Sequence, residues 1–298
     1  MSTARVAPMS EAQLQAWRTS RAEAGTPFPA TSGDRRQEAV TVTVDGVEVG
    51  GAVLEYADEL VTAGGTRCAV RVLQTTLPRD ADDAWTVAIK ALEDHVIASG
   101  ATVLTTAVAP DLAAAFGRAG YRATMTTVGK RLDPDTAPEL QEDRRVEVRE
   151  MDSDERARFV ADVGEQLRAG MARAGVADAS TPGLADLDDR LAGLLADRPP
   201  PMELLVMGTV DGVPVGRAWA TLVEVDGGLD FHGNTIDLFP EHRGQRLTPS
   251  FLGALRRHVH EIGVRDVHLR VYGHDAGARR TFLDAGAGIE DVHLRKDL

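Results

Sequence analysis

A short basic loop between a strand and a helix holds the residues best suited to bind a phosphate. Residues 230–239 read as a strand, and the sequence Arg-Gly-Gln-Arg at 243–246 fills the turn that follows. Thr248 stands at the expected N-cap and Pro249 at the first helical position, where its missing N–H costs nothing. The helix is predicted from apolar residues at helical spacing, Leu252, Leu255, Val259 and Ile262. Backbone N–H groups at a helix start favour anions, so the loop predicts a phosphate-bearing ligand.

The segment LFPEHRGQRLT, residues 238–248, resembles the acyl-CoA loop of the GNAT superfamily of N-acetyltransferases. The family loop has a Val-x-Pro segment followed by Arg/Gln-x-x-Gly-x-Gly/Ala. Residues 238–240 match the first segment, and residues 243–245 match the start of the second. Arg246 and Thr248 stand where the family usually has glycine. Arg246 either points outward, where its guanidinium helps to bind phosphate, or crowds the loop for CoA.

A second segment, DAGARRTFLDAG at residues 275–286, is similar to the family's Asn-x-x-Ala-x-x-x-Tyr-x-x-x-Gly helix. Ala278 and Gly286 fit, whereas Asp275 replaces the asparagine and Phe282 the tyrosine. The resemblance implies acetyl-CoA or another acyl-CoA as co-substrate, and no metal. It assigns CoA binding to Leu238, Phe239, Pro240, Arg243, Gly244, Gln245, Arg246, Leu247, Thr248, Asp275, Arg279 and Phe282.

Acyl transfer to an amine also needs a base, and the family resemblance places it on the strand at 230–239. His232 is the first candidate because an imidazole titrates near neutral pH, and Asp237 is the second, with Asp230 also considered. A hydrogen-bonded strand histidine without a catalytic role explains His232 equally well. Strict alternation along the strand puts residues 232, 234, 236 and 238 on one face and residues 231, 233, 235 and 237 on the other. His258 and His260 are expected at the surface, and with His232 they form no known metal-binding spacing.

Phe282 removes the acid that the family's tyrosine implies. Phenylalanine keeps the ring but lacks the hydroxyl that protonates the departing thiolate. Tyr272 is the only nearby phenol that can replace it.

Composition excludes several other classes of protein. The chain has 298 residues and a net charge of −13, which argues against nucleic-acid binding. Cys68 is the single cysteine, so neither an intrachain disulfide nor a cysteine-rich zinc site can form, and a buried position is expected for it. Without an apolar run of membrane-spanning length or a secretory signal, a cytoplasmic protein is predicted.

The order of predicted elements indicates two tandem copies of one α+β unit. Residues 1–132 read as a helix, a hairpin turning at Asp45-Gly46, a third strand, then helix, strand, helix and strand. Residues 133–145 have linker composition, and residues 146–298 repeat the order, with a hairpin at Asp211-Gly212. In the first copy LPRDADDAW replaces the basic loop, and its aspartates repel a diphosphate. The first copy is therefore predicted to be degenerate and to support the second.

The predicted fold is α+β, two tandem GNAT-like domains, each with a mixed, mostly antiparallel sheet flanked by helices. The predicted function is transfer of an acetyl or other short acyl group from CoA to a small-molecule amine, and residues 174–189 are expected to face that substrate. The alternative is a non-catalytic CoA-binding or structural protein of the same fold. A third hypothesis, aminoacyl transfer from tRNA, is disfavoured by the negative net charge of the chain. No membrane partner is expected. The sequence is compatible with an oligomer and does not decide the oligomeric state.

Overall fold

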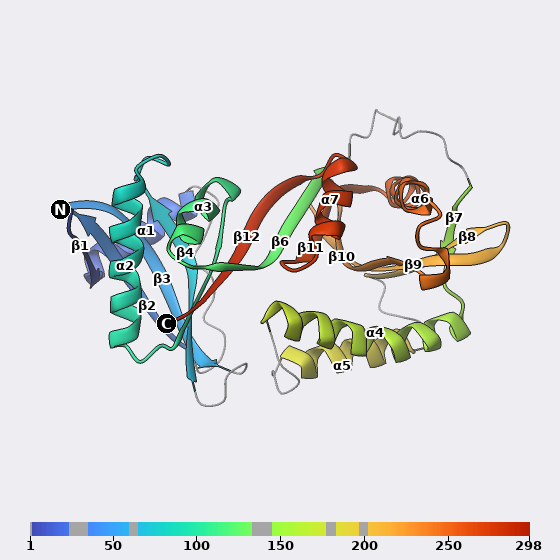
Figure 1. The fold of residues 1–298 in the computed structure, drawn as a ribbon, viewed down its shortest axis with the longest axis horizontal. Coiled ribbons are helices and arrows are strands. Elements are labelled where there is room, and N and C mark those ends of the chain that lie inside the picture. The colour runs from blue at the N-terminus through green and yellow to red at the C-terminus, as the bar shows by residue number, and fades with distance from the viewer. Residues whose placement is uncertain (1, 24–34, 60–64, 133–144, 177–182, 197–201) are drawn as a thin grey trace. The chain divides into compact units, whose positions relative to one another are not determined.

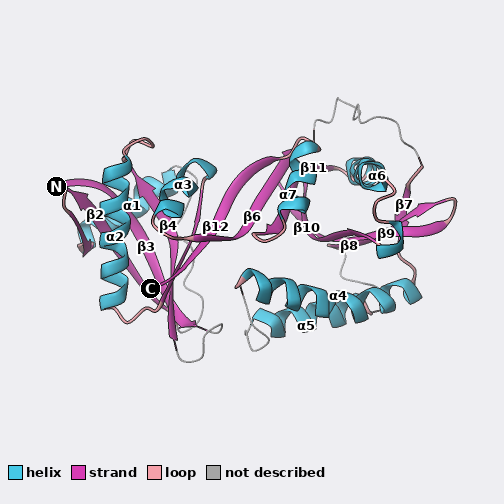
Figure 2. Ribbon diagram, in the orientation of Figure 1, coloured by secondary structure: helices cyan, strands magenta, loops and turns pink. Residues whose placement is uncertain are grey.

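The computed structural model describes the chain except for residues 1, 24–34, 60–64, 133–144, 177–182 and 197–201. Its contacts divide the chain into two compact units, residues 1–125 with 291–298, and residues 126–290. Each unit packs helices on a mixed, mostly antiparallel sheet, so the predicted fold class is confirmed (Figures 1 and 2). Within the described residues, no helix has the length and apolar character needed to cross a membrane. The predicted linker, except Arg145, and part of the predicted substrate-facing segment lie outside the described residues.

The first unit is built on a sheet in which β1 to β5 lie side by side in chain order. The pairs are antiparallel except β4 with β5, which is parallel. Its elements are β1 (Ala4–Pro8), α1 (Glu11–Glu23), β2 (Arg36–Val44), β3 (Val47–Glu59), β4 (Gly65–Thr75), α2 (Asp82–Ala98), β5 (Val103–Val108) and α3 (Pro110–Arg118). The sequence analysis missed β1, which pairs with β2 at the sheet edge. Cys68 is fully buried, and burial raises the pKa of its thiol to about 12, in line with the predicted core position.

The second unit has the sheet order β6-β11-β10-β9-β8-β7, with β10 and β11 parallel. Figure 1 shows α6 and α7 on one side of this sheet and α4 and α5 on the other. Its elements are β6 (Arg122–Arg131), β7 (Glu147–Glu150), α4 (Ser153–Ala174), α5 (Gly183–Leu194), β8 (Glu203–Val210), β9 (Val213–Val225), β10 (Gly228–Leu238), the 3₁₀ turn η1 (Pro240–His242), α6 (Leu247–Glu261), β11 (Val264–Tyr272) and α7 (Ala276–Asp284). The last strand, β12 (Gly288–Asp297), begins in this unit, and its residues from 291 onward belong to the first.

Two apolar cores hold this sheet, one on each face. Phe231, Leu238 and Phe251 belong to the core under α6, and Phe159 and Trp219 to the core under α4 and α5. These two cores identify which face of the sheet each β10 side chain occupies.

The two units repeat one strand pattern. The runs β2-β3-β4-β5 and β8-β9-β10-β11 each consist of two antiparallel pairs followed by a parallel pair. The last strand of each repeat is exchanged, because residues 292–297 of β12 pair with β5, while β6 neighbours β11. The compact units therefore differ from the predicted boundaries, 1–132 and 146–298, at both strands. The register partners of β5 and β12 are 184 or more residues apart in the sequence, so no local signal predicts the exchange.

Local sequence accounts well for the turns and for α4. Asp45-Gly46 and Asp211-Gly212 have positive φ at both residues, which is the conformation of tight two-residue hairpin turns. Helix α4 begins with a capping box, in which Asp152 accepts from the Glu155 N–H and Glu155 from the Asp152 N–H. The predicted hairpins are confirmed.

Candidate functional site

Two parallel strands diverge in the second unit and leave a cleft between them. β10 pairs with β11 only as far as Gly233 and Leu269. Both strands continue beyond that point, β10 to Leu238 and β11 to Tyr272. The Leu269 side chain lies so close to Gly233 that a Cβ there would clash. A cleft of about 110 Å³ opens where the strands part, lined by residues 233–236, residues 269–272 and, on and before α7, Asp275, Ala278 and Phe282.

A bulge at the same point changes which face the later β10 residues occupy. The register between β10 and β9 shifts between Gly233 and Thr235, so Asn234 is the extra residue. Ile236 packs in the core under α6, together with Phe231. Asp237 bonds to Arg217, which bonds to Asp162 of α4 on the opposite side. The predicted alternation is therefore wrong after residue 233, because one inserted residue moves every later side chain to the other face.

His232, the first predicted base, lies on the paired part of β10, just before the cleft. Its exposed ring stacks on His268 of β11 with 4.9 Å between ring centroids. Desolvation by nearby protein atoms lowers the pKa of His232, and the neighbouring His268 acts in the same direction. His232 is therefore neutral near pH 7, as a base must be. It is not among the residues that line the cleft.

Asp237, the second predicted base, is the partner of a buried arginine. Its carboxylate lies 3.3 Å from Nε of Arg217, whose side chain is 7% exposed. Arg217 also reaches Asp162 at 3.2 Å and lies over the rings of Phe159 and Phe239. Burial raises the pKa of Asp237, and Arg217 opposes that shift. The bulge places Asp237 on the α4 side of the sheet.

The predicted phosphate loop connects β10 to α6 through η1. Gly244 has φ +77° and Arg246 has φ +59°, so the chain turns through left-handed conformations at alternate residues. Helix α6 begins at buried Leu247 with Arg246 as its N-cap, and no side chain caps it. The prediction of Thr248 as N-cap is wrong, because the turn closes two residues earlier. The first N–H groups of α6 are thus oriented for an anion.

Side chains brace the loop from within. The Arg243 guanidinium donates to the Leu238 carbonyl, and the Gln245 amide donates to the Glu241 carbonyl. Phe239 N–H donates to the Val215 carbonyl, and Pro240 starts η1, so the predicted Leu-Phe-Pro segment carries the chain from strand to loop. Loop and cleft both adjoin the end of β10.

Arg246 occupies the position where the resembling family usually has glycine, and its left-handed backbone explains that preference. A residue with a Cβ costs about 1–2 kcal/mol in this left-handed conformation. Glycine avoids that cost, but it loses more backbone entropy on folding, which offsets part of the gain. We expect Arg246→Gly to raise the free energy of unfolding by about 0.5–1 kcal/mol in chemical denaturation. A control is Arg257→Gly within α6, which should destabilise by about 1 kcal/mol. Equal destabilisation by both changes would contradict the strained backbone.

The start of α7 forms the far wall of the cleft. Asp275 caps the helix, because its Oδ1 accepts from the Ala278 N–H at 2.8 Å. Phe282 and Tyr272 both line the cleft, and Arg279 is half-buried on α7. The Tyr272 hydroxyl donates to the Leu167 carbonyl of α4 at 3.4 Å, and burial raises its pKa. Asp275, Phe282 and the replacement phenol Tyr272 therefore line one cleft, whereas the predicted Arg279 is not among its lining residues.

The structure adds a larger apolar cavity that the sequence analysis missed. It measures about 440 Å³ and lies between the sheet and helices α6 and α7. Phe282, Thr248 and Ile236 line it, with Lys130 and Arg256 as its cationic members. Burial lowers the pKa of both cations, and for Lys130 the charge of Arg256 adds to the effect. Lys130 lies on β6, so the exchanged strand hid this cavity from sequence reasoning.

No protein-family model matches the chain, and no curated protein matches it significantly. Solved structures are similar over most of its length. A tandem GNAT protein from the clavulanic acid biosynthesis pathway, without acetyl-CoA, is 16% identical with a TM-score of 0.42, over 99% of this chain and 98% of that chain. A GCN5-related N-acetyltransferase from Sphaerobacter thermophilus is 19% identical with a TM-score of 0.45, over 99% of this chain and 95% of that chain. Another from Kribbella flavida is 18% identical with a TM-score of 0.42, over 88% of each chain.

These structures belong to the superfamily that the sequence motifs resemble. Because every one of the three TM-scores is below 0.5, the similarities add no argument about the site.

Proposed function

We propose that the second unit binds an acyl-CoA in the cleft between β10 and β11 and transfers its acetyl or other short acyl group to a small-molecule amine. The observation that carries the proposal is the divergence of β10 from β11 beside the loop at the start of α6. The unpaired edge of β10 offers backbone hydrogen bonds to an extended pantetheine arm. The loop offers N–H groups and the helix dipole to a diphosphate. A single linear ligand, acyl-CoA, can contact both the edge of β10 and the loop at the start of α6.

The first unit is proposed not to bind CoA. Helix α2 stands where α6 stands in the second unit, and its first turn carries Asp82 and Asp83. Asp82 pairs with Arg118, but Asp83 remains a negative charge where a diphosphate would lie. The N-cap there is Ala81, without a side-chain hydrogen bond. This unit is proposed to be a degenerate copy with a supporting role.

His232 is the proposed base. Its neutral imidazole lies on the face of β10 opposite α6, next to the point where the strands part. Because it does not line the cleft, a bridging water is proposed to carry the amine proton to it. Asp237 is the second candidate, since burial raises the pKa of its carboxyl and it lies on the α4 side. Arg217 holds that carboxylate, which reduces its basicity.

Tyr272 is the proposed acid for the departing thiolate. Its raised pKa keeps the phenol protonated at neutral pH, and its ring shares the cleft with Phe282. A thiol with a pKa of about 8.5 leaves tolerably without an acid, so we expect Tyr272→Phe to lower kcat by about tenfold or less. Phe282→Tyr should leave kcat unchanged or raise it modestly, and should rescue Tyr272→Phe.

The comparison is made at saturating acyl-CoA, with CoA affinity measured separately for each variant. Loss of turnover in Phe282→Tyr with unchanged CoA affinity would contradict the proposed place of the acid.

A non-catalytic CoA-binding protein is the second proposal, favoured by strained Arg246 in the loop and by Phe282 in the cleft. Thermal unfolding of the full chain with a panel of acyl-CoAs, followed by thiol release in the presence of small amines, separates the two. Stabilisation with thiol release supports the enzyme. Stabilisation without release for any amine supports the second proposal. The absence of stabilisation overturns both.

A further inference from the structure

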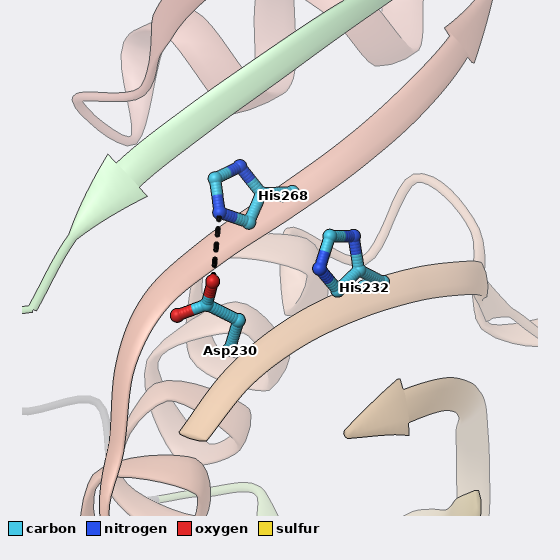
Figure 3. Close-up of side chains that lie close together, drawn as sticks. All are labelled: Asp230, His232 and His268. Atoms are coloured by element: carbon cyan, nitrogen blue, oxygen red, sulfur yellow. Dashed lines mark ion pairs between the residues drawn. The ribbon is translucent and has the colours of Figure 1, made fainter. Parts of the chain in front are cut away.

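Three side chains on neighbouring strands of the second unit form a ligand set that acyl transfer does not require. Asp230 and His232 are two residues apart on β10, and His268 is the register partner of His232 on β11. One ligand atom from each of the three lies within 4.8 Å of the others. Figure 3 shows the carboxylate and the two imidazoles gathered over the paired part of the strands.

The polar atoms of this cluster are incompletely satisfied. Oδ1 of Asp230 is buried and has no hydrogen-bond partner within the described part of the chain, and Oδ2 of the same carboxylate is the oxygen that faces His268. Such an atom costs free energy unless a cation, proton or water meets it. The exposed imidazole of His232, stacked on His268, has a lone pair available for a ligand bond when neutral.

Glu290 orients the third ligand. Its carboxylate lies 2.8 Å from Nδ1 of His268, so Nδ1 carries the proton that Glu290 accepts. In the neutral ring, Nε2 is then an acceptor, and it faces the Asp230 carboxylate at 3.9 Å. Two acceptors that face each other need a cation or a proton between them. A carboxylate behind a histidine is also the arrangement that orients metal-binding imidazoles.

We propose that Asp230, His232 and His268 bind a divalent first-row transition metal, with Zn²⁺ as the fitting ion, and that Glu290 orients His268. Two imidazoles and one carboxylate suit zinc and disfavour Mg²⁺ or Ca²⁺, which prefer oxygen ligands. Bonds of about 2.0–2.2 Å in tetrahedral geometry place ligand atoms about 3.3 Å apart. The present separations of up to 4.8 Å must therefore close by up to about 1.5 Å. Exposed His232 can rotate to do this. The fourth position is left to solvent.

The site joins β10 to β11 immediately before they part. A bound ion therefore fixes the width of the cleft at its closed end. It also takes the lone pair of His232, so zinc should inhibit acyl transfer; this one consequence rests on the proposed function. The metal site itself does not depend on catalysis, and its test uses binding alone.

Calorimetric titration of the metal-free full chain with zinc chloride at neutral pH tests the site. We expect one zinc per chain, an affinity loss of at least tenfold in both Asp230→Asn and His268→Ala, and a 10- to 100-fold loss in Glu290→Gln. His260→Ala on α6 is the control and should bind as the unaltered chain does. Cobalt should give the visible absorption of a tetrahedral complex, which His268→Ala should lose.

Two results would overturn the proposal. One is zinc binding unaffected by both Asp230→Asn and His268→Ala, with both variants folded by circular dichroism. The other is absence of zinc binding while His268→Ala lowers stability, which makes the cluster a protonated imidazole between two carboxylates. CoA binding is measured on the same samples, so the metal site can fail while the proposed function stands.

Discussion

Gly244→Asp is expected to lower the affinity of the chain for CoA by a factor on the order of 100 or more. Gly244 has φ +77°, and among the described residues a Cβ built there meets no atom within 4 Å, so the new side chain has room in this part of the fold. The added carboxylate would face the diphosphate at the start of α6. Charges of like sign about 4 Å apart near a protein surface repel by about 4 kcal/mol. A loss of binding free energy of that size lowers the affinity by about three orders of magnitude.

Gly212→Asp is the matched control for this change. Gly212 has φ +78°, and its built Cβ likewise meets no atom of the described chain within 4 Å, but it lies in the β8–β9 hairpin turn. The backbone strain and the added charge are the same, while the anion site is untouched. Calorimetry should show CoA affinity lost in Gly244→Asp and kept in Gly212→Asp. Equal affinities in the two variants would move the diphosphate away from the loop.

His232→Ala is expected to lower the acyl-transfer rate by about 10²–10⁴-fold, the usual contribution of a general base. CoA affinity should hardly change, because His232 does not line the cleft. His260→Ala on α6 is the control and should retain full activity. Rates are compared in metal-chelated buffer at saturating acyl-CoA.

The competing base is tested by the same assay. A full rate in His232→Ala together with a large loss in Asp237→Asn would assign the proton to the aspartate. Full rates in both variants would leave deprotonation to water.

Elements that depend on local sequence were predictable. The Asp-Gly turns need positive φ at consecutive residues, which those two residue types adopt easily. Helix α6 follows from apolar residues at helical spacing, and Leu255 and Val259 are buried as that spacing requires. The β10–α6 loop was also recognisable from its residues, although its backbone conformation was not.

Features that depend on register were not predictable. A single bulged residue, Asn234, moves Asp237 to the same side of the sheet as His232. No feature of the amino-acid sequence of β10 indicates this bulge. His268 meets His232 only because β10 and β11 pair in one particular register. Glu290 reaches His268 from β12, which is a third strand. A histidine pair assembled across strands leaves no motif, so no metal spacing was visible in the sequence.

The strand exchange could not be predicted for the same reason. The chain order places β12 with the second copy, but its hydrogen bonds go to β5 of the first unit. Only the pairing of distant residues distinguishes the two arrangements, and composition or periodicity carries no information about it.

Calorimetric titration of the full chain with acetyl-CoA measures both whether the protein binds the ligand and how many sites it has. One site per chain is expected, because the α6 loop of the second unit has N–H groups oriented for an anion, whereas α2 of the first unit begins with Asp82 and Asp83. A stoichiometry of two would contradict the degenerate role of the first unit. An absence of binding to any acyl-CoA would contradict the proposed function of the cleft.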